Sequence, residues 1–221
     1  GKRCMCFSKK AIDLIYKDSN LKNITTDENF DTFSFSWYNN TDIDPATGLT
    51  PYNNMQKVLK VCHDFVDNFD TNFSNLLFIG QTGVGKTFLS NCIARALMDS
   101  CHSIIYLTAG EFFDSFKSDD FKEFGSSKFD TSFFVECDLL IIDDLGTEKA
   151  SDYNFSNLFN TINERLLRRK SIIISSNLEM PDIETRYSQR IFSRLVSAYS
   201  ILRLFGDDIR CMKKLSPTKR S

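Results

Sequence analysis

A glycine-rich stretch has the residue types and spacing to hold phosphate groups. It reads GQTGVGKT over residues 80–87 and fits the pattern G-x-x-x-x-G-K-[ST]. Glycines let backbone N–H groups turn inward around phosphate oxygens, and the start of the following helix adds its positive dipole end. Lys86 can reach the β- and γ-phosphates, and the Thr87 hydroxyl can hold Mg²⁺. We expect ATP or ADP to contact Gly80, Thr82, Gly83, Val84, Gly85, Lys86, Thr87 and Phe88.

Two adjacent carboxylates follow an apolar run further along the chain, in the stretch LLIIDD over residues 139–144. A buried strand that ends in two carboxylates places them at the carboxyl edge of the sheet, where α/β proteins bind ligands. Asp143 is the expected Mg²⁺ ligand, directly or through water. Asp144 is expected to orient and polarise the attacking water. Downstream of an intact phosphate loop, this reading is favoured over an Asp-rich turn.

Two further groups have the chemistry to complete the site. Asn177 ends an SSN stretch after an apolar run, where an amide can hold the attacking water; alternatively, it caps a helix or a turn. Arg190 and Arg194 are four residues apart and therefore share one helix face. Such a pair can be a solvated face, or it can supply a cation to the nucleotide of a neighbouring copy.

Alternating apolar and amphipathic stretches indicate the elements that position these groups. The apolar runs predict strands at residues 76–79, 104–107, 139–144, 171–176 and 201–205. Helical spacing predicts helices at residues 52–69, 86–99, 152–169 and 181–199, one more after the cap residue Thr108, and a short helix with a loop within residues 117–136. Since strands that alternate with helices form parallel sheets with right-handed crossovers, we expect an α/β fold with a five-stranded parallel sheet.

Composition and charge restrict the possible functions of the protein only slightly. The net charge of −2 produces no global field that favours nucleic acid or a membrane surface. No apolar run approaches the roughly 18 residues of a membrane span. The seven Cys form no C-x-x-C pair, which is typical of reduced thiols, so we expect a cytoplasmic protein without membrane contact. Aromatic residues at positions 33, 35 and 37 alternate, which indicates either a strand or an extended arm laid over the domain.

The ordered set GQTGVGKT, LLIIDDLGTE, SSN and QRIFSRL resembles the AAA+ ATPase domain of bacterial replicative-helicase loaders of the DnaC/DnaI type, over residues 54–210. The resemblance implies a P-loop NTPase fold of the AAA+/ASCE type, a three-layer sandwich without a C-terminal helical lid domain. It makes Asn177 the sensor 1 residue, Arg194 the arginine finger and Arg190 its companion. Arg210, in GDDIR, is a sensor 2 candidate.

One residue departs from the common AAA+ pattern. Most AAA+ proteins carry Glu where this chain has Asp144, which is one methylene shorter. Loaders that resemble this chain share the Asp, so we expect Mg²⁺-dependent ATP hydrolysis that is slow rather than absent.

The resemblance also implies partners. Loaders carry an N-terminal module that grips the helicase, and we interpret residues 1–50 as an extension and linker, the tail of a truncated module, with the ATPase domain at residues 51–221. Cys4 and Cys6 are a possible remnant of a zinc site. The expected partners are a hexameric replicative helicase, single-stranded DNA bound weakly and only with ATP, and further copies of the chain in a head-to-tail ring or helical filament.

Two function classes stay open. The first is a helicase loader that acts in the initiation of DNA replication. The second is the ATPase subunit of a transposition system that acts on duplex DNA. Such subunits are typically short basic chains, whereas this chain is mildly acidic, which favours the loader. A small-molecule kinase needs an acceptor-binding lid, which the sequence does not display.

Residues 108–136 are the expected contact with single-stranded DNA, because related loaders place an extra helix there. The region contains cations and rings suited to phosphates and bases, namely Phe116, Lys117, Phe121, Lys122 and Lys128. Acidic residues outnumber these lysines. An amphipathic surface helix without DNA contact is therefore the alternative.

Overall fold

The strands of the protein form one parallel sheet, as expected from the sequence. The computed structural model describes residues 28–117 and 131–215. Its strands are β1 (Leu76–Ile79), β2 (Ile104–Thr108), β3 (Leu139–Leu145), β4 (Ser171–Ser176) and β5 (Ser200–Arg203). They lie in the order β2-β3-β4-β1-β5, and every neighbouring pair is parallel. Strand β4 therefore lies between the strand of the phosphate loop and the strand of the paired carboxylates.

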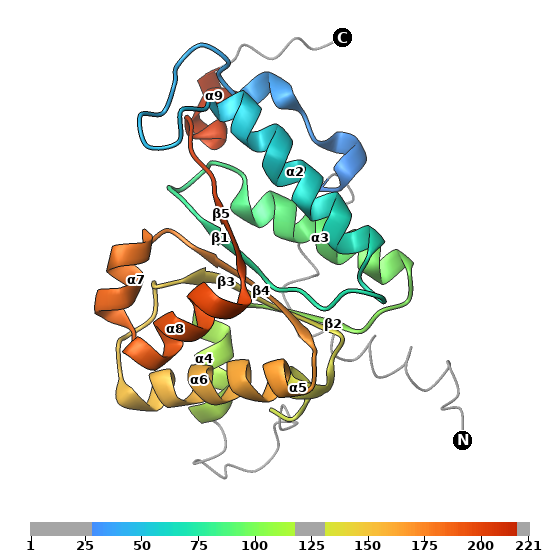
Figure 1. Cartoon of the computed structure of the whole chain (residues 1–221), viewed down its shortest axis with the longest axis vertical. Coiled ribbons are helices and arrows are strands. Elements are labelled where there is room, and N and C mark those ends of the chain that lie inside the picture. Colours follow the sequence, from blue (N-terminus) through green and yellow to red (C-terminus); the bar gives the residue numbers. More distant parts are fainter. Residues whose placement is uncertain (1–27, 118–130, 216–221) are drawn as a thin grey trace.

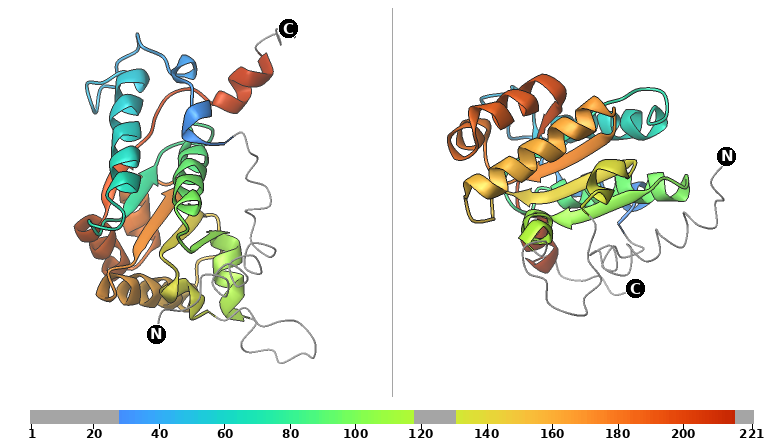
Figure 2. Two further views of the ribbon diagram at one scale, coloured as in Figure 1. Left: turned by 90° about the vertical axis from the view of Figure 1, so that its right-hand side faces the viewer. Right: turned by 90° about the horizontal axis from the view of Figure 1, so that it is seen from below.

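Helices cover both faces of the sheet and produce three layers (Figures 1 and 2). One face carries α2 (Pro51–Asp67) and α3 (Lys86–Asp99). The other carries α4 (Ala109–Lys117), α5 (Phe133–Glu136), α6 (Asp152–Leu167), α7 (Met180–Arg186) and α8 (Gln189–Ala198). Side chains alternate between the two cores along each strand: Leu76 and Phe78 face α2 and α3, whereas Leu77 and Ile79 face the opposite helices.

The single helix predicted at residues 181–199 is wrong, because the chain forms two helices there. Helix α7 ends before Tyr187, whose backbone is extended, and the side chain of Ser188 accepts a hydrogen bond from the Ile191 N–H to begin α8. The buried residues Ile183, Tyr187, Ile191 and Leu195 keep a spacing of four through the break. The apolar periodicity therefore does not reveal it, and Ser188 as an N-cap residue is the local signal.

The aromatic segment before α2 is an arm, not a strand. Two short 3₁₀ turns, η2 (Phe30–Thr32) and η3 (Phe35–Trp37), lay its rings against the core of α2 and α3. Thr50 then caps α2, so the helix begins at the predicted domain boundary. The boundary itself stays a prediction, and Cys4 and Cys6 lie outside the described residues.

The segment after β5 differs from the expectation, whereas the start of α4 agrees with it. After β5 the described chain forms one short helix, α9 (Ile209–Leu215), which the sequence did not predict, rather than a helical lid domain. Thr108 caps α4 as predicted, since its hydroxyl accepts a hydrogen bond from the Glu111 N–H. None of the helices in the described ranges is long and apolar enough to cross a membrane.

Candidate nucleotide-binding site

The phosphate loop between β1 and α3 has a backbone that only glycine adopts easily. Gly83 and Gly85 have φ angles of 82° and 105°, in the left-handed region. A Cβ atom on Gly83 would lie 2.1 Å from Oδ1 of Asp208, and one on Gly85 would lie 2.7 Å from the Tyr38 hydroxyl. The loop therefore turns its backbone around an open cradle at the N-terminus of α3, which is a favourable place for phosphate.

Lys86 points into this cradle from the first turn of α3. It is 5% exposed, and its Nζ donates hydrogen bonds of 2.7 Å to the carbonyls of Gly80 and Gln81 and to Oδ1 of Asn177. Burial lowers the pKa of Lys86, and the nearby carboxylates of Asp144 and Asp143 oppose that shift. The ammonium is thus held by neutral oxygens that phosphate oxygens can replace.

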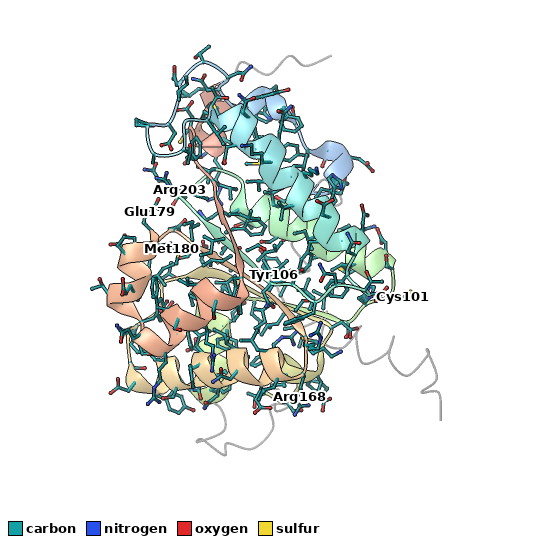
Figure 3. The ribbon with its side chains drawn as sticks, in the orientation of Figure 1. Cys101, Tyr106, Arg168, Glu179, Met180 and Arg203 are labelled. Carbon is teal, nitrogen blue, oxygen red and sulfur yellow. The ribbon has the colours of Figure 1, made fainter. Side chains whose placement is uncertain are left out.

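Asp143 lies buried at the end of β3 with both oxygens bonded. Its Oδ2 accepts from Thr87 Oγ1 at 3.0 Å and from the Tyr106 hydroxyl at 2.8 Å, and its Oδ1 accepts from the Ser175 hydroxyl. Thr87 and Asp143, the predicted metal ligands, are therefore brought together. Tyr106 is a site residue that the sequence analysis missed, and Figure 3 shows it inside the molecule. The one sequence feature that could have indicated its role is a ring with a hydroxyl group within the apolar run of β2.

Asp144 adopts a left-handed backbone with φ of 56°, a conformation that Asp tolerates better than most residues. Its N–H donates to Ser175 Oγ at 3.0 Å, and its Oδ1 lies 3.4 Å from Nδ2 of Asn177. Burial, then the Asp143 carboxylate, raises the pKa of Asp144, while the positive charge of Lys86 lowers it. The two residues predicted to handle the attacking water thus face each other beside Lys86.

The arm before α2 and helix α9 form the second wall of the cavity. Phe33, Trp37 and Tyr38 line it from the arm, and Ile209, Arg210 and Lys213 line it from α9. The Tyr38 hydroxyl donates to the carbonyl of Val84 at 3.3 Å, and Lys213 Nζ lies 5.6 Å from the centre of the Trp37 ring. This wall is aromatic and cationic, so it suits a flat base. The alternation of rings in the arm was visible in the sequence, but nothing local connected it to the phosphate loop.

The predicted site residues fall into three groups: those that line the cavity, those beside it and those away from it. Thr82, Gly83, Gly85, Lys86, Thr87, Phe88, Asp144, Asn177 and Arg210 line the cavity. Gly80 and Val84 lie beside it and lend carbonyls to Lys86 and Tyr38. Arg190 and Arg194 do not line it: both are exposed on α8, and Arg194 Nε donates to Oδ1 of Asn163 on α6 at 2.8 Å.

A nucleotide with a divalent metal fits this donor set. The glycine cradle and buried ammonium suit phosphates, and the bonded pair of Thr87 and Asp143 supplies the oxygen ligands that Mg²⁺ prefers. The sheet order, the three layers and this site define a P-loop nucleotide-binding protein.

The chain belongs to the family of IstB-like ATP binding proteins, whose profile matches residues 50–216. It is 24% identical over 151 residues to the replicative helicase loader DnaC of Escherichia coli K12, an alignment of 68% of this chain and 61% of that protein. The chain thus matches less than two thirds of the length of this relative.

Solved structures show the same fold. The crystal structure of a DnaC helicase loader aligns with 78% of this chain and 96% of its own at a TM-score of 0.59 and 21% identity. DnaA from Aquifex aeolicus bound to AMPPCP aligns with 84% of this chain and 52% of its own at a TM-score of 0.65 and 17% identity. The predicted resemblance to DnaC/DnaI-type AAA+ domains is therefore confirmed, and the chain is an ATP-binding protein of this family.

Proposed function

We propose that this protein is an ATP-dependent loader of a hexameric replicative helicase. The observation that carries the proposal is the division of its catalytic groups: Lys86, Asp144 and Asn177 meet in one cavity, whereas Arg190 and Arg194 are exposed on α8. A chain with this arrangement hydrolyses ATP only when another copy presents its arginines. The similarity to DnaC favours the helicase as the target of the resulting assembly.

The chemistry assigns each group one task. Lys86 and the loop amides bind the phosphates, and Thr87 with Asp143 holds Mg²⁺, which neutralises charge on the phosphate oxygens when bound. Asp144 accepts the proton of the attacking water, and Asn177 orients that water. Arg194, with Arg190 beside it, reaches the nucleotide of the next copy. Such a contact joins the arginine face of α8 in one copy to the nucleotide site of the next copy. Because these are two different surfaces, the contacts are head-to-tail and produce rings or helical filaments.

Single-stranded DNA is the proposed second ligand of the assembly, and α4 contributes little to it in one chain. The Phe116 ring packs 5.2 Å from Phe112 and 5.7 Å from Phe134, and Lys117 Nζ pairs with Asp114 at 2.7 Å. This packing favours the surface-helix alternative for the start of the region, while Phe121, Lys122 and Lys128 lie outside the described residues. Binding therefore depends on several aligned copies.

Two measurements test the proposal. The protein, extended by its native preceding residues where they exist, should retain a hexameric helicase in a pull-down with ATP. Fluorescence anisotropy should show single-strand binding that requires ATP and weakens with salt, with a logarithmic slope of about −0.7 per phosphate neutralised. Tight binding by a proven monomer would contradict the proposal.

A transposition ATPase is the second candidate, because the matching family is described by its IstB-like members. The two candidates differ in their nucleic acid. Preference for duplex over single-stranded DNA in the same anisotropy experiment, without helicase retention, would favour transposition.

A further inference from the structure

A second buried carboxylate lies outside the nucleotide cavity, in the loop after β3. The side chain of Glu148 is 3% exposed. One of its oxygens accepts from the Gly146 N–H at 2.8 Å, and the other accepts from the Tyr187 hydroxyl at 2.6 Å. Arg186 Nε lies 3.5 Å from that second oxygen. Both oxygens of Glu148 are thus hydrogen-bonded, and Arg186 balances the charge beside one of them, which holds the carboxylate in one position.

The two carboxylate oxygens of Glu148 contact two different segments, one next to Asp144 and one next to the arginines of α8. Gly146 follows Asp144 by two residues, so one oxygen is bonded to the loop that leaves the cavity. Tyr187 precedes Arg190 by three residues and lies at the break between α7 and α8. Glu148 therefore joins the end of the strand that bears the catalytic carboxylates to the start of the helix that bears the exposed arginines.

Gly146 and Tyr187, the two residues that Glu148 connects, are both closely packed by their neighbours. A Cβ atom on Gly146 would lie 2.7 Å from Leu178 Cδ1, and the Ser176 hydroxyl donates to the Leu145 carbonyl at 2.5 Å. The Tyr187 ring packs edge-on against Phe155 of α6, 5.3 Å between centres. Burial and the Glu148 carboxylate raise the pKa of Tyr187, so its hydroxyl stays a donor.

Helix α7 is also tied at its other end. Arg203, at the end of β5, lies 3.3 Å from Oε2 of Glu179, the residue before α7, and both are labelled in Figure 3. Since α7 is held at both ends, a displacement of the loop after β3 is passed through Glu148 to the start of α8 rather than absorbed in α7.

We propose that Glu148 is a positioning residue that couples the loop after Asp144 to the presentation of Arg190 and Arg194 to a neighbouring copy. The inference rests on the proposed function, in which these arginines act in trans. Glu148→Gln keeps the size of the side chain, but it removes the charge that balances Arg186 and one of the two strong acceptors. The start of α8 then loses its charge-balanced attachment to the loop after β3, while the packing of α8 on α6 and the bond from Arg194 to Asn163 remain.

A directional mixing experiment tests the coupling. Arg194→Ala has an intact nucleotide site, and Lys86→Ala has intact arginines, so their mixture should recover ATPase activity through mixed interfaces. Glu148→Gln added to the Lys86→Ala partner, which donates arginines, should lower that activity about tenfold. The same change added to the Arg194→Ala partner should leave it unchanged. A residue with a merely structural role would lower both mixtures alike.

Hydrogen exchange supplies a readout that does not depend on hydrolysis. In the nucleotide-free protein, Glu148→Gln should speed exchange in α8 about tenfold and leave β3 and β4 unchanged. Glu184→Gln, an exposed carboxylate on α7, is the matched control and should change neither. Unchanged exchange in α8, or equal losses in the two mixtures, overturns the role of Glu148. If the simple mixture of Arg194→Ala and Lys86→Ala stays inactive while co-assembly is verified, the trans action of the arginines fails instead.

Discussion

The carboxyl edge of the sheet and the outer face of α8 are built in opposite ways. At the sheet edge, Lys86 and Asp143 are buried and each is bonded to several partners before any ligand arrives. On α8, Arg190 and Arg194 are exposed, and the side chain of Arg194 donates a hydrogen bond to a neutral amide. The groups at the phosphate site are thus preorganised within one chain, whereas the arginines that we propose complete catalysis face outward. This difference teaches that binding and turnover can be separated by mutation.

The largest expected effect comes from a substitution on α8. Arg194→Ala should bind ATP normally and lose about 10³- to 10⁵-fold in turnover, because an arginine supplied in trans stabilises charge in the transition state. Steady-state ATPase assays at matched assembly are the measurement. Arg168→Ala, an exposed arginine on the C-terminal end of α6, is the control. Loss of nucleotide affinity in Arg194→Ala would mean that the residue acts on its own site.

The next largest effect is a loss of nucleotide affinity after a substitution at the sheet edge. Lys86→Ala should weaken ATP and ADP binding at least about a hundredfold, since two charge-assisted hydrogen bonds to phosphate are lost. Isothermal calorimetry measures it, and Lys60→Ala, exposed on α2, is the matched control. An unchanged ADP affinity would refute the assignment of the phosphate site.

A smaller effect, on Mg²⁺ affinity, measures how much the hydrogen bonds of Asp143 preorganise the sheet edge. Tyr106→Phe removes only the hydroxyl that donates to Asp143, so Mg²⁺ should bind about tenfold more weakly in the presence of ADP. Titration of Mg²⁺ followed by nucleotide fluorescence reports this. Tyr153→Phe, which removes a hydroxyl from an exposed position on α6, should have no effect. Equal Mg²⁺ affinity in wild type and Tyr106→Phe would show that Ser175 and Thr87 suffice to orient Asp143.

The smallest effect concerns pH. The folded-state pKa of Asp144 is raised, so between its usual value and the raised value the folded protein binds more protons than the unfolded chain. This group therefore lowers the stability of the nucleotide-free protein as pH rises through that window. Asp144→Asn removes the effect without new backbone strain, because Asn also tolerates the left-handed region.

Melting temperatures test this sign. The gain of Asp144→Asn over wild type should be larger at about pH 7 than at about pH 4. Asp182→Asn, exposed on α7, should show no such pH-dependent gain. A gain that shrinks toward neutral pH would mean that the ionised Asp144 is stabilised by its neighbours rather than penalised by burial.

Much of the site was predictable because its parts are local. The phosphate loop needs glycines, a lysine and a threonine in consecutive positions, and a buried strand that ends in two carboxylates is a continuous pattern. The strand positions followed from apolar runs, and all five were found within one or two residues of their observed ends. The break before α8 was missed because Tyr187 continues the apolar spacing of α7.

Residue order along the chain sufficed to predict the phosphate loop, the paired carboxylates and the alternation of strands with helices, since each depends on neighbours a few positions away. Long-range packing decided the rest. Only the folded chain brings the arm of Phe33 and Trp37 and the helix of Arg210 together as one wall of the cavity, and only it buries Glu148 between the end of β3 and the start of α8. Contacts between residues so far apart depend on the register of the sheet and the closing of loops, and no periodicity in the sequence records them.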